Sequence, residues 1–185
     1  MKRRELLAGC GVGFVTATAG CLDSLPWSDE TIDTSSPEAV VNSYITLQEQ
    51  LYDDPEATKE KLDTVMSNDA VSQIGSSQNA QFLEKAELTI TSIDGISTTT
   101  EGLTVRQIRE LAQRGPQQKS QLESRTINDL GSRKTALVDA AYSRKIETEI
   151  NGKSNTFENS AKERYLVVNE KESWQIVLRT PVLKQ

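Results

Sequence analysis

The chain contains no histidine and only two cysteines, so few of its side chains could do chemistry. Ser-His-Asp and Cys-His catalysis are excluded, as are zinc sites built from Cys and His. Any acid–base chemistry would need a carboxylate, a tyrosine or a lysine. The best-supported pair is Glu163 with Tyr142, in which the carboxylate would be the base of an isomerase or lyase. Their spacing is not diagnostic, so the sequence predicts no catalytic residue, no metal and no cofactor.

These two residues lie in a predicted β-hairpin. Asn151-Gly152 stands between two long β-favouring runs, which is the strongest short-range hairpin signal. If both are central residues of a type I′ turn, residues that face each other have numbers summing to 303. Apolar partners then share one face and opposite charges meet on the other, whereas a shift by one residue destroys both patterns. A second hairpin is predicted to turn within 169–173 and to end at Pro181.

The predicted inner face of this sheet carries polar side chains that could line a ligand pocket. Arg144 could bind a carboxylate or phosphate group through two hydrogen bonds. In the alternative interpretation, Arg144 and Asn159 lie beyond the cover of the helices and face water, or a bulge turns them to the other face. The side chains proposed to line the pocket are Tyr142, Arg144, Asn159, Glu163, Tyr165 and Trp174.

Helix-start signals precede the hairpins. Ser36-Pro37-Glu38 combines a capping residue, proline at the first helical position and an acidic residue, and predicts a helix to about residue 52. Asp54-Pro55-Glu56 repeats the pattern for a second helix to about residue 66, and a third short helix is expected over 68–74. Their apolar residues follow helical spacing, with Gln48 as a polar interruption.

A strand and a helical insertion are predicted between these helices and the first hairpin. Residues 88–93 favour a strand that could extend to residue 98. Thr104 and Gln107 have the spacing of a capping box and begin an amphipathic helix that ends at Gly115-Pro116. Residues 117–132 are polar and predicted to be partly helical, so the insertion covers about 101–133.

The N-terminus has the features of an export signal. Lys2-Arg3-Arg4 precedes a short apolar run over residues 6–19, followed by small residues and Cys21. Arg3 and Arg4 match a twin-arginine address. The sequence Thr18-Ala19-Gly20-Cys21 resembles the lipobox of prokaryotic lipoproteins, here of the haloarchaeal type. This resemblance implies removal of residues 1–20 and attachment of lipid to Cys21.

Two alternatives to Cys21 lipidation remain open. Cys10 also follows small residues, but only two apolar residues would precede its lipobox. An uncleaved membrane helix would need about 20 apolar residues, which the glycine-rich run does not supply. Lipidation at Cys21 is the stronger prediction, with residues 21–35 as an acidic, flexible tether to a single domain over residues 36–185.

The charge of the chain excludes some partners. The net charge is −6, and removal of the leader takes away three basic residues and one acidic residue, which changes it to −8. An acidic surface repels nucleic acid, so we expect no nucleic-acid partner.

The order of elements resembles a known superfamily. N-terminal helices are followed by a strand and by a meander that ends in Tyr165-Leu166-Val167-Val168, a turn and Trp174-Gln175-Ile176-Val177. This pattern is similar to the nuclear-transport-factor-two-like superfamily, and the resemblance implies a cone-shaped α+β fold in which N-terminal helices pack on a curved antiparallel sheet. The helical insertion departs from the pattern of that superfamily.

These features predict location better than activity. We expect a lipid-anchored protein on the extracytoplasmic face of the cell membrane. It would act as a non-enzymatic binding or interaction module for a small molecule or an envelope protein. The alternatives are a small pocket enzyme with a carboxylate base, and a structural or accessory subunit of an envelope complex, which could be a homodimer formed by sheet packing.

Overall fold

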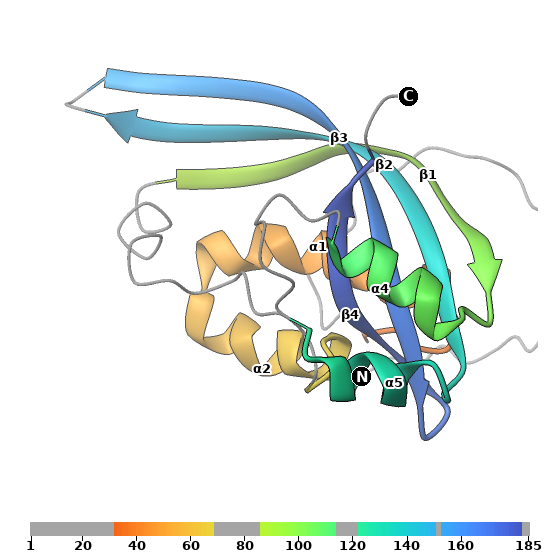
Figure 1. The fold of residues 1–185 in the computed structure, drawn as a ribbon. Helices are drawn as coiled ribbons and strands as arrows, with labels where there is room; N and C mark the ends of the chain where they lie inside the picture. The colour runs from red at the N-terminus through yellow and green to blue at the C-terminus, as the bar shows by residue number, and fades with distance from the viewer. Residues whose placement is uncertain (1–31, 69–85, 114–121, 151–152, 183–185) are drawn as a thin grey trace, which may run out of the picture. The chain divides into compact units, whose positions relative to one another are not determined.

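A computed structural model describes residues 32–68, 86–113, 122–150 and 153–182. Within these ranges the fold is α+β, as expected, with N-terminal helices on a curved antiparallel sheet (Figure 1). The sheet has four strands in the order β1-β2-β3-β4. Their bounds are Ala86–Glu101 for β1, Thr135–Ile150 for β2, Lys153–Glu170 for β3 and Ser173–Pro181 for β4.

The two N-terminal helices begin at the predicted capping residues. Helix α1 spans Pro37–Asp53, and the Ser36 hydroxyl accepts the Ala39 N–H at 3.1 Å. Helix α2 spans Pro55–Val65 and is capped in the same way by Asp54, which accepts the Ala57 N–H at 3.0 Å. The third predicted helix, over 68–74, falls almost wholly outside the described residues.

Helix α1 is also fastened to the first strand through its acidic side chains. The Glu38 carboxylate accepts the backbone N–H of Thr98 at 3.0 Å, and Glu49 accepts that of Ile90. The hydrogen bond from Thr98 lowers the pKa of Glu38. The β1–β2 register shifts next to both donor residues, and such bulges bend a strand and increase its twist. The bulges therefore curve β1 alongside helix α1. The strand is also longer at both ends than predicted.

The predicted insertion forms two short helices between β1 and β2. Helix α4 spans Val105–Gln113 and begins at the predicted capping box, in which the Gln107 side chain accepts the Thr104 N–H at 2.9 Å. Helix α5 spans Ser124–Leu130. The end of the α4 segment at Gly115-Pro116 lies outside the described residues.

The predicted register of the first hairpin is confirmed along its whole described length. Every β2–β3 pair sums to 303, from Thr135↔Val168 to Ile150↔Lys153, although the turn itself at 151–152 is not described. The second hairpin turns at Lys171 and Glu172, which both have positive φ, and β4 ends at Pro181 as predicted.

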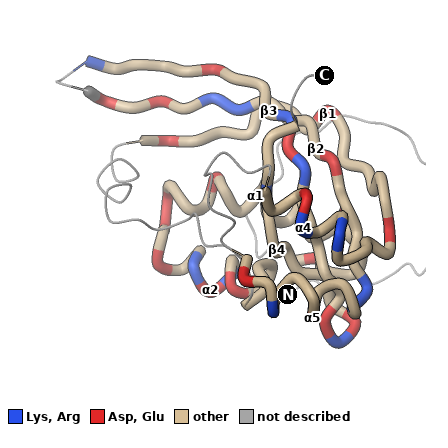
Figure 2. The backbone as a smooth tube through the Cα atoms, viewed as in Figure 1, with Lys and Arg blue, Asp and Glu red and all other residues tan. Residues whose placement is uncertain are grey.

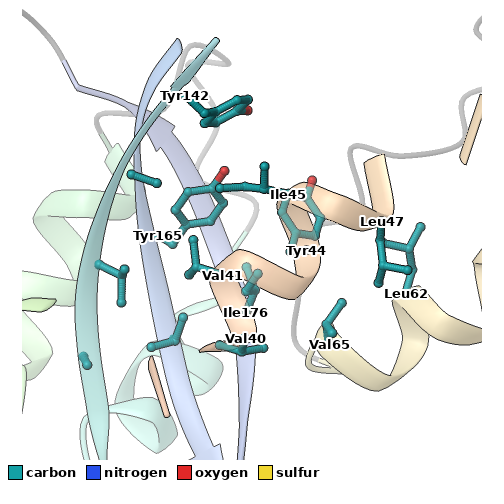
Figure 3. Close-up of a cluster of buried hydrophobic side chains, with 14 residues drawn as sticks. Val40, Val41, Tyr44, Ile45, Leu47, Leu62, Val65, Tyr142, Tyr165 and Ile176 are labelled. Carbon is teal, nitrogen blue, oxygen red and sulfur yellow. The ribbon is translucent and has the colours of Figure 1, made fainter. Parts of the chain in front are cut away.

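Strict alternation along β2 and β3 gives the sheet two apolar faces. Ala136, Val138 and Val167 lie in one core with α1 and α2 (Figure 3). Leu137 and Leu166, one residue along, lie in a second core with α4 and α5. Helices therefore cover both faces of the inner part of the sheet, whereas the sequence predicted helical cover on a single face.

Candidate functional site

The best candidate site is a polar cluster on the inner face of the sheet, between β2, β3 and β4. We call it the tyrosine–glutamate cluster and define it as Tyr142, Glu163, Tyr165 and Arg179. The register places Tyr142 opposite Ala161, Ala140 opposite Glu163, and Tyr165 between Val138 and Arg179. Because Ala140 is small, the Glu163 side chain has room between the two tyrosines.

Both tyrosines hydrogen-bond to one oxygen of the glutamate. The Tyr142 hydroxyl donates to Glu163 Oε2 at 2.9 Å, and the Tyr165 hydroxyl donates to the same oxygen at 2.6 Å. On the other side, Arg179 Nη1 lies 3.8 Å from Glu163 Oε1. The Glu163 side chain is 15% exposed, whereas both tyrosines are fully buried. In Figure 3, Tyr142 and Tyr165 project from adjacent strands toward helix α1.

Burial and the nearby carboxylate keep the hydroxyls protonated. Burial, followed by the charge of Glu163, raises the pKa of Tyr142 to about 12. The same two causes raise the pKa of Tyr165 further. Burial lowers the pKa of Arg179, but Tyr44 and Glu163 outweigh this effect, so its pKa is raised. At neutral pH the cluster therefore consists of two fixed donors and a permanent cation around one carboxyl group.

Helix α1 closes the cluster with two residues one helical turn apart. The Tyr44 ring meets the Tyr165 ring edge-on, with centroids 5.8 Å apart and an angle of 68° between the planes. Gln48 lies beside Tyr142 and lowers the pKa of its hydroxyl. Its amide nitrogen is buried, yet it makes no well-directed hydrogen bond within the described part of the chain. Its contact with the Tyr142 hydroxyl satisfies it only in part. A poorly satisfied buried donor is costly, so an acceptor on a ligand or water would be stabilised at this atom.

Arg144 and Asn159 lie farther along the same face and bond to each other. The Arg144 Nε donates to Asn159 Oδ1 at 3.0 Å, and Asn159 is exposed. The charge of Arg144 lowers the pKa of Tyr142, so Arg144 interacts electrostatically with the tyrosine–glutamate cluster. This arrangement is close to the alternative interpretation, in which the pair lies toward water beyond the helices.

Trp174 lies apart from the other proposed pocket residues. It pairs with Asn169 near the start of β4, and its backbone N–H donates to the Thr34 carbonyl at 2.9 Å. Its side chain packs against the core under α1 and α2. Five residues along β4, Arg179 takes the place in the cluster that the sequence had suggested for the tryptophan.

Sequence reasoning missed Arg179 and Gln48 as members of this neighbourhood. Alternation from Trp174 and Ile176 would have placed Arg179 on the outer face. A register shift between Leu166 and Val167 moves it to the inner face. Gln48 did have a signal, because it interrupts the apolar face of its helix.

The predicted anchor residues Arg3, Arg4 and Cys21 lie outside the described residues, and their roles stay predictions. Among the described helices, none has the length and apolar character needed to cross a membrane. The same ranges contain no group of three or more acidic or cysteine side chains that could hold a metal ion.

Comparison with known proteins gives little further information. No protein family matches the sequence, and no curated protein matches it. The fold is similar to the crystal structure of the intermembrane space region of chloroplast protein ARC6, with a TM-score of 0.47 and 13% sequence identity. The match covers 84% of this chain and 100% of that one. We draw no conclusion about function from this likeness.

Proposed function

We propose that this chain is a lipid-anchored extracytoplasmic module that binds a small polar molecule at the tyrosine–glutamate cluster without transforming it. The anchor is supported by the signal sequence that ends at Cys21. Two acyl chains on this thiol would hold the domain at the membrane, because each buried methylene contributes about 0.8 kcal/mol and one chain alone binds only marginally.

The observation that supports binding is the unequal use of the two oxygens of Glu163. Oε2 accepts both tyrosine hydroxyls, while Oε1 has the long contact with Arg179 at 3.8 Å. The nearby Gln48 amide nitrogen is a buried donor without a well-directed partner. A molecule with a donor for Oε1 and an acceptor for Gln48, such as an alcohol or an amide, would satisfy both groups.

The same geometry favours binding over catalysis. A general base must direct a free lone pair toward the proton that it removes, and it works best with a pKa near the operating pH. Both tyrosine hydroxyls instead donate to Glu163 Oε2, and Arg179 lies beside Oε1, so the carboxyl group is held in position by groups that already use its lone pairs. The tyrosines do not serve as bases either, because their pKa values are raised.

A carboxylate base is the second candidate, because Glu163 lies beside two tyrosines and is largely buried. In ketosteroid-type chemistry a carboxylate base and a hydroxyl donor act together across a dry site. The two candidates differ in the fate of the bound molecule: a binding module returns it unchanged, whereas an isomerase or lyase returns a product.

The anchor is tested by cell fractionation of Cys21→Ser. We expect the wild type in the membrane fraction and the variant in the medium, with Cys10→Ser as the matched control that stays membrane-bound. If Cys21→Ser remains in the membrane and Cys10→Ser is released, the anchor is Cys10. If neither is released, lipid on a cysteine does not hold the protein.

The ligand site is tested by native mass spectrometry of protein gently extracted from membranes. We expect a co-purifying mass that is lost in Glu163→Gln and Gln48→Met and retained in Glu158→Gln, which alters an exposed glutamate on the same strand. Incubation of the released molecule with fresh protein should leave it unchanged. Conversion by the wild type but not by Glu163→Gln would support the enzyme instead.

A further inference from the structure

One edge of β3 is open along the outer half of the first hairpin. Strand β4 pairs with β3 only from Glu163 to Glu170, whereas β2 pairs with it along its whole length. In Figure 1 the β2–β3 hairpin and the start of β1 extend beyond β4. We call residues 143–162 the arm, and the side of residues 153–161 that faces away from β2 the arm edge. Within the described ranges, no strand pairs with the arm edge.

The backbone groups that the arm edge presents follow from one hydrogen bond. The Val182 N–H donates to the Lys162 carbonyl at 2.9 Å, so this carbonyl points away from β2. In an antiparallel ladder, alternate residues direct both their N–H and C=O groups to the same side. The residues that direct these groups outward along the arm edge are therefore Ser154, Thr156, Glu158 and Ser160.

The arm edge lacks the features that usually prevent pairing with another strand. Natural edge strands are protected by proline, bulges, charges or short length. Residues 154–161 contain no proline, the β2–β3 register has no bulge, and Glu158 is the one charged residue of the stretch. Figure 2 shows the sparse charge along this strand of the arm.

An exposed aromatic side chain lies at the centre of the same stretch. Phe157 is 51% exposed and is the large hydrophobic residue that the described surface leaves open. It ends an apolar row across the sheet, since Leu88 pairs with Ile146 and Ile146 pairs with Phe157. Such a row would gain cover if another strand were added next to Phe157.

We propose that the arm edge pairs antiparallel with the arm edge of a second copy of this chain. The four outward residues are placed symmetrically about Phe157, so a two-fold axis there uses all of them. Facing residues would then have numbers summing to 314. Ser154 pairs with the second copy's Ser160, and Thr156 pairs with the second copy's Glu158.

This register also gives favourable side-chain contacts. The two Phe157 rings meet across the axis as a non-hydrogen-bonded pair, where side chains come closest. Asn155 faces the second copy's Asn159, and Lys153 faces the second copy's Ala161, so like charges are not directly opposed. The apolar row Leu88–Ile146–Phe157 becomes continuous across both copies. A second copy fits the edge better than an unrelated strand because the sequence is complementary to itself in this register.

Cysteine cross-linking tests the register directly. The full chain carrying Cys10→Ser and Cys21→Ser has no other cysteine, so an added one reports its own contacts. Phe157→Cys should form a disulfide-linked dimer under mild oxidation, because facing Cα atoms lie within disulfide reach. Asn155→Cys alone should not, since its two copies would be about 13 Å apart along the strands. A mixture of Asn155→Cys and Asn159→Cys should cross-link.

Proline substitution tests whether the backbone edge is responsible. Thr156→Pro removes an outward N–H but no β2 bond, so the hairpin should remain and the dimer dissociation constant should rise roughly tenfold or more. Thr156→Ala is the matched control with unchanged association. Sedimentation of the same cysteine-free chain measures both, and circular dichroism checks folding.

Neither experiment depends on the lipid anchor or on a ligand. Monomeric Phe157→Cys after oxidation, or equal cross-linking of Asn155→Cys alone, would overturn the register. A wild-type chain that stays monomeric at high concentration, or a folded Thr156→Pro that dimerises as well as wild type, would overturn the proposal.

Discussion

The arm and the rest of the β2–β3 hairpin, residues 135–142 and 163–170, share two strands and one uninterrupted register, but their surroundings differ. We call these residues the inner half. In the inner half, helices cover both faces, and residues 165–168 are all buried. In the arm, residues 156–160 of β3 are all exposed. The backbone ladder is the same in both halves, so the difference lies in the side chains.

Within this one hairpin, the inner half has the side chains that stabilise the fold, and the arm has those that are free to contact other molecules. The inner half alternates apolar residues on both faces, so each strand contributes to two cores. The arm carries serine, threonine, asparagine and charged residues, which leave a ladder with little apolar burial. We therefore expect the inner half to determine the free energy of unfolding and the arm to be available for contacts with other molecules.

The largest predicted effect comes from matched truncations on β3. Leu166→Ala should lower the free energy of unfolding by about 2–5 kcal/mol, because Leu166 is 1% exposed in the second core. Phe157→Ala should cost less than about 1 kcal/mol, because this side chain is half exposed in the monomer. Urea unfolding at low protein concentration measures both without association. Equal losses would mean that the arm contributes to the core as much as the inner half does.

The tyrosine–glutamate cluster gives the inner half a dependence on alkaline pH that the tyrosine-free arm cannot share. Folding raises the pKa of Tyr142 to about 12, compared with about 10 in the unfolded chain. The folded state thus holds this proton more tightly. The resulting stability is fully present below pH 10 and is lost as the pH rises through 12, by at most about 3 kcal/mol.

Tyr142→Phe removes the hydroxyl whose proton makes the free energy of unfolding depend on pH. The slope of unfolding free energy against pH between 10 and 12 should become shallower by about 1 kcal/mol per pH unit on average. Absorbance at 295 nm should show that tyrosine ionisation in the wild type accompanies loss of the folded dichroism signal. Tyrosines that ionise near pH 10 in a folded chain would show that the cluster is open to water.

The sequence predicted the hairpin register and the helix starts because these depend on local signals. The pairing expected from the position of Asn151-Gly152 in the sequence is confirmed, and Ser36 and Asp54 cap their helices as expected. Face alternation also brought Tyr142, Glu163 and Tyr165 together. Arg179 was missed because its face depends on a register shift, which local sequence does not encode. The position of Gln48 depends on how α1 packs on the sheet, which is set by tertiary contacts.

The smallest predicted effect compares an ion pair at the end of the inner half with one in the arm. Arg164 donates from Nε and Nη2 to the two oxygens of Asp139, at 2.6 and 2.7 Å, and these hydrogen bonds raise the pKa of Arg164. The arm pair is Lys145 with Glu147, at 3.0 Å. Glu158 faces Lys145 across the strands, as the register predicts.

Double-mutant cycles with alanine distinguish the two pairs. We expect a coupling energy of about 0.5–1 kcal/mol for Asp139–Arg164, because the guanidinium is held at two points and both side chains are about two-thirds buried. Lys145–Glu147 should give about 0–0.5 kcal/mol, because a single flexible contact near water is screened and loses side-chain entropy. Added salt should reduce the arm coupling more than the other. A stronger coupling for Lys145–Glu147 would mean that the arm is held by its own side chains, and that its order does not depend on the ladder alone.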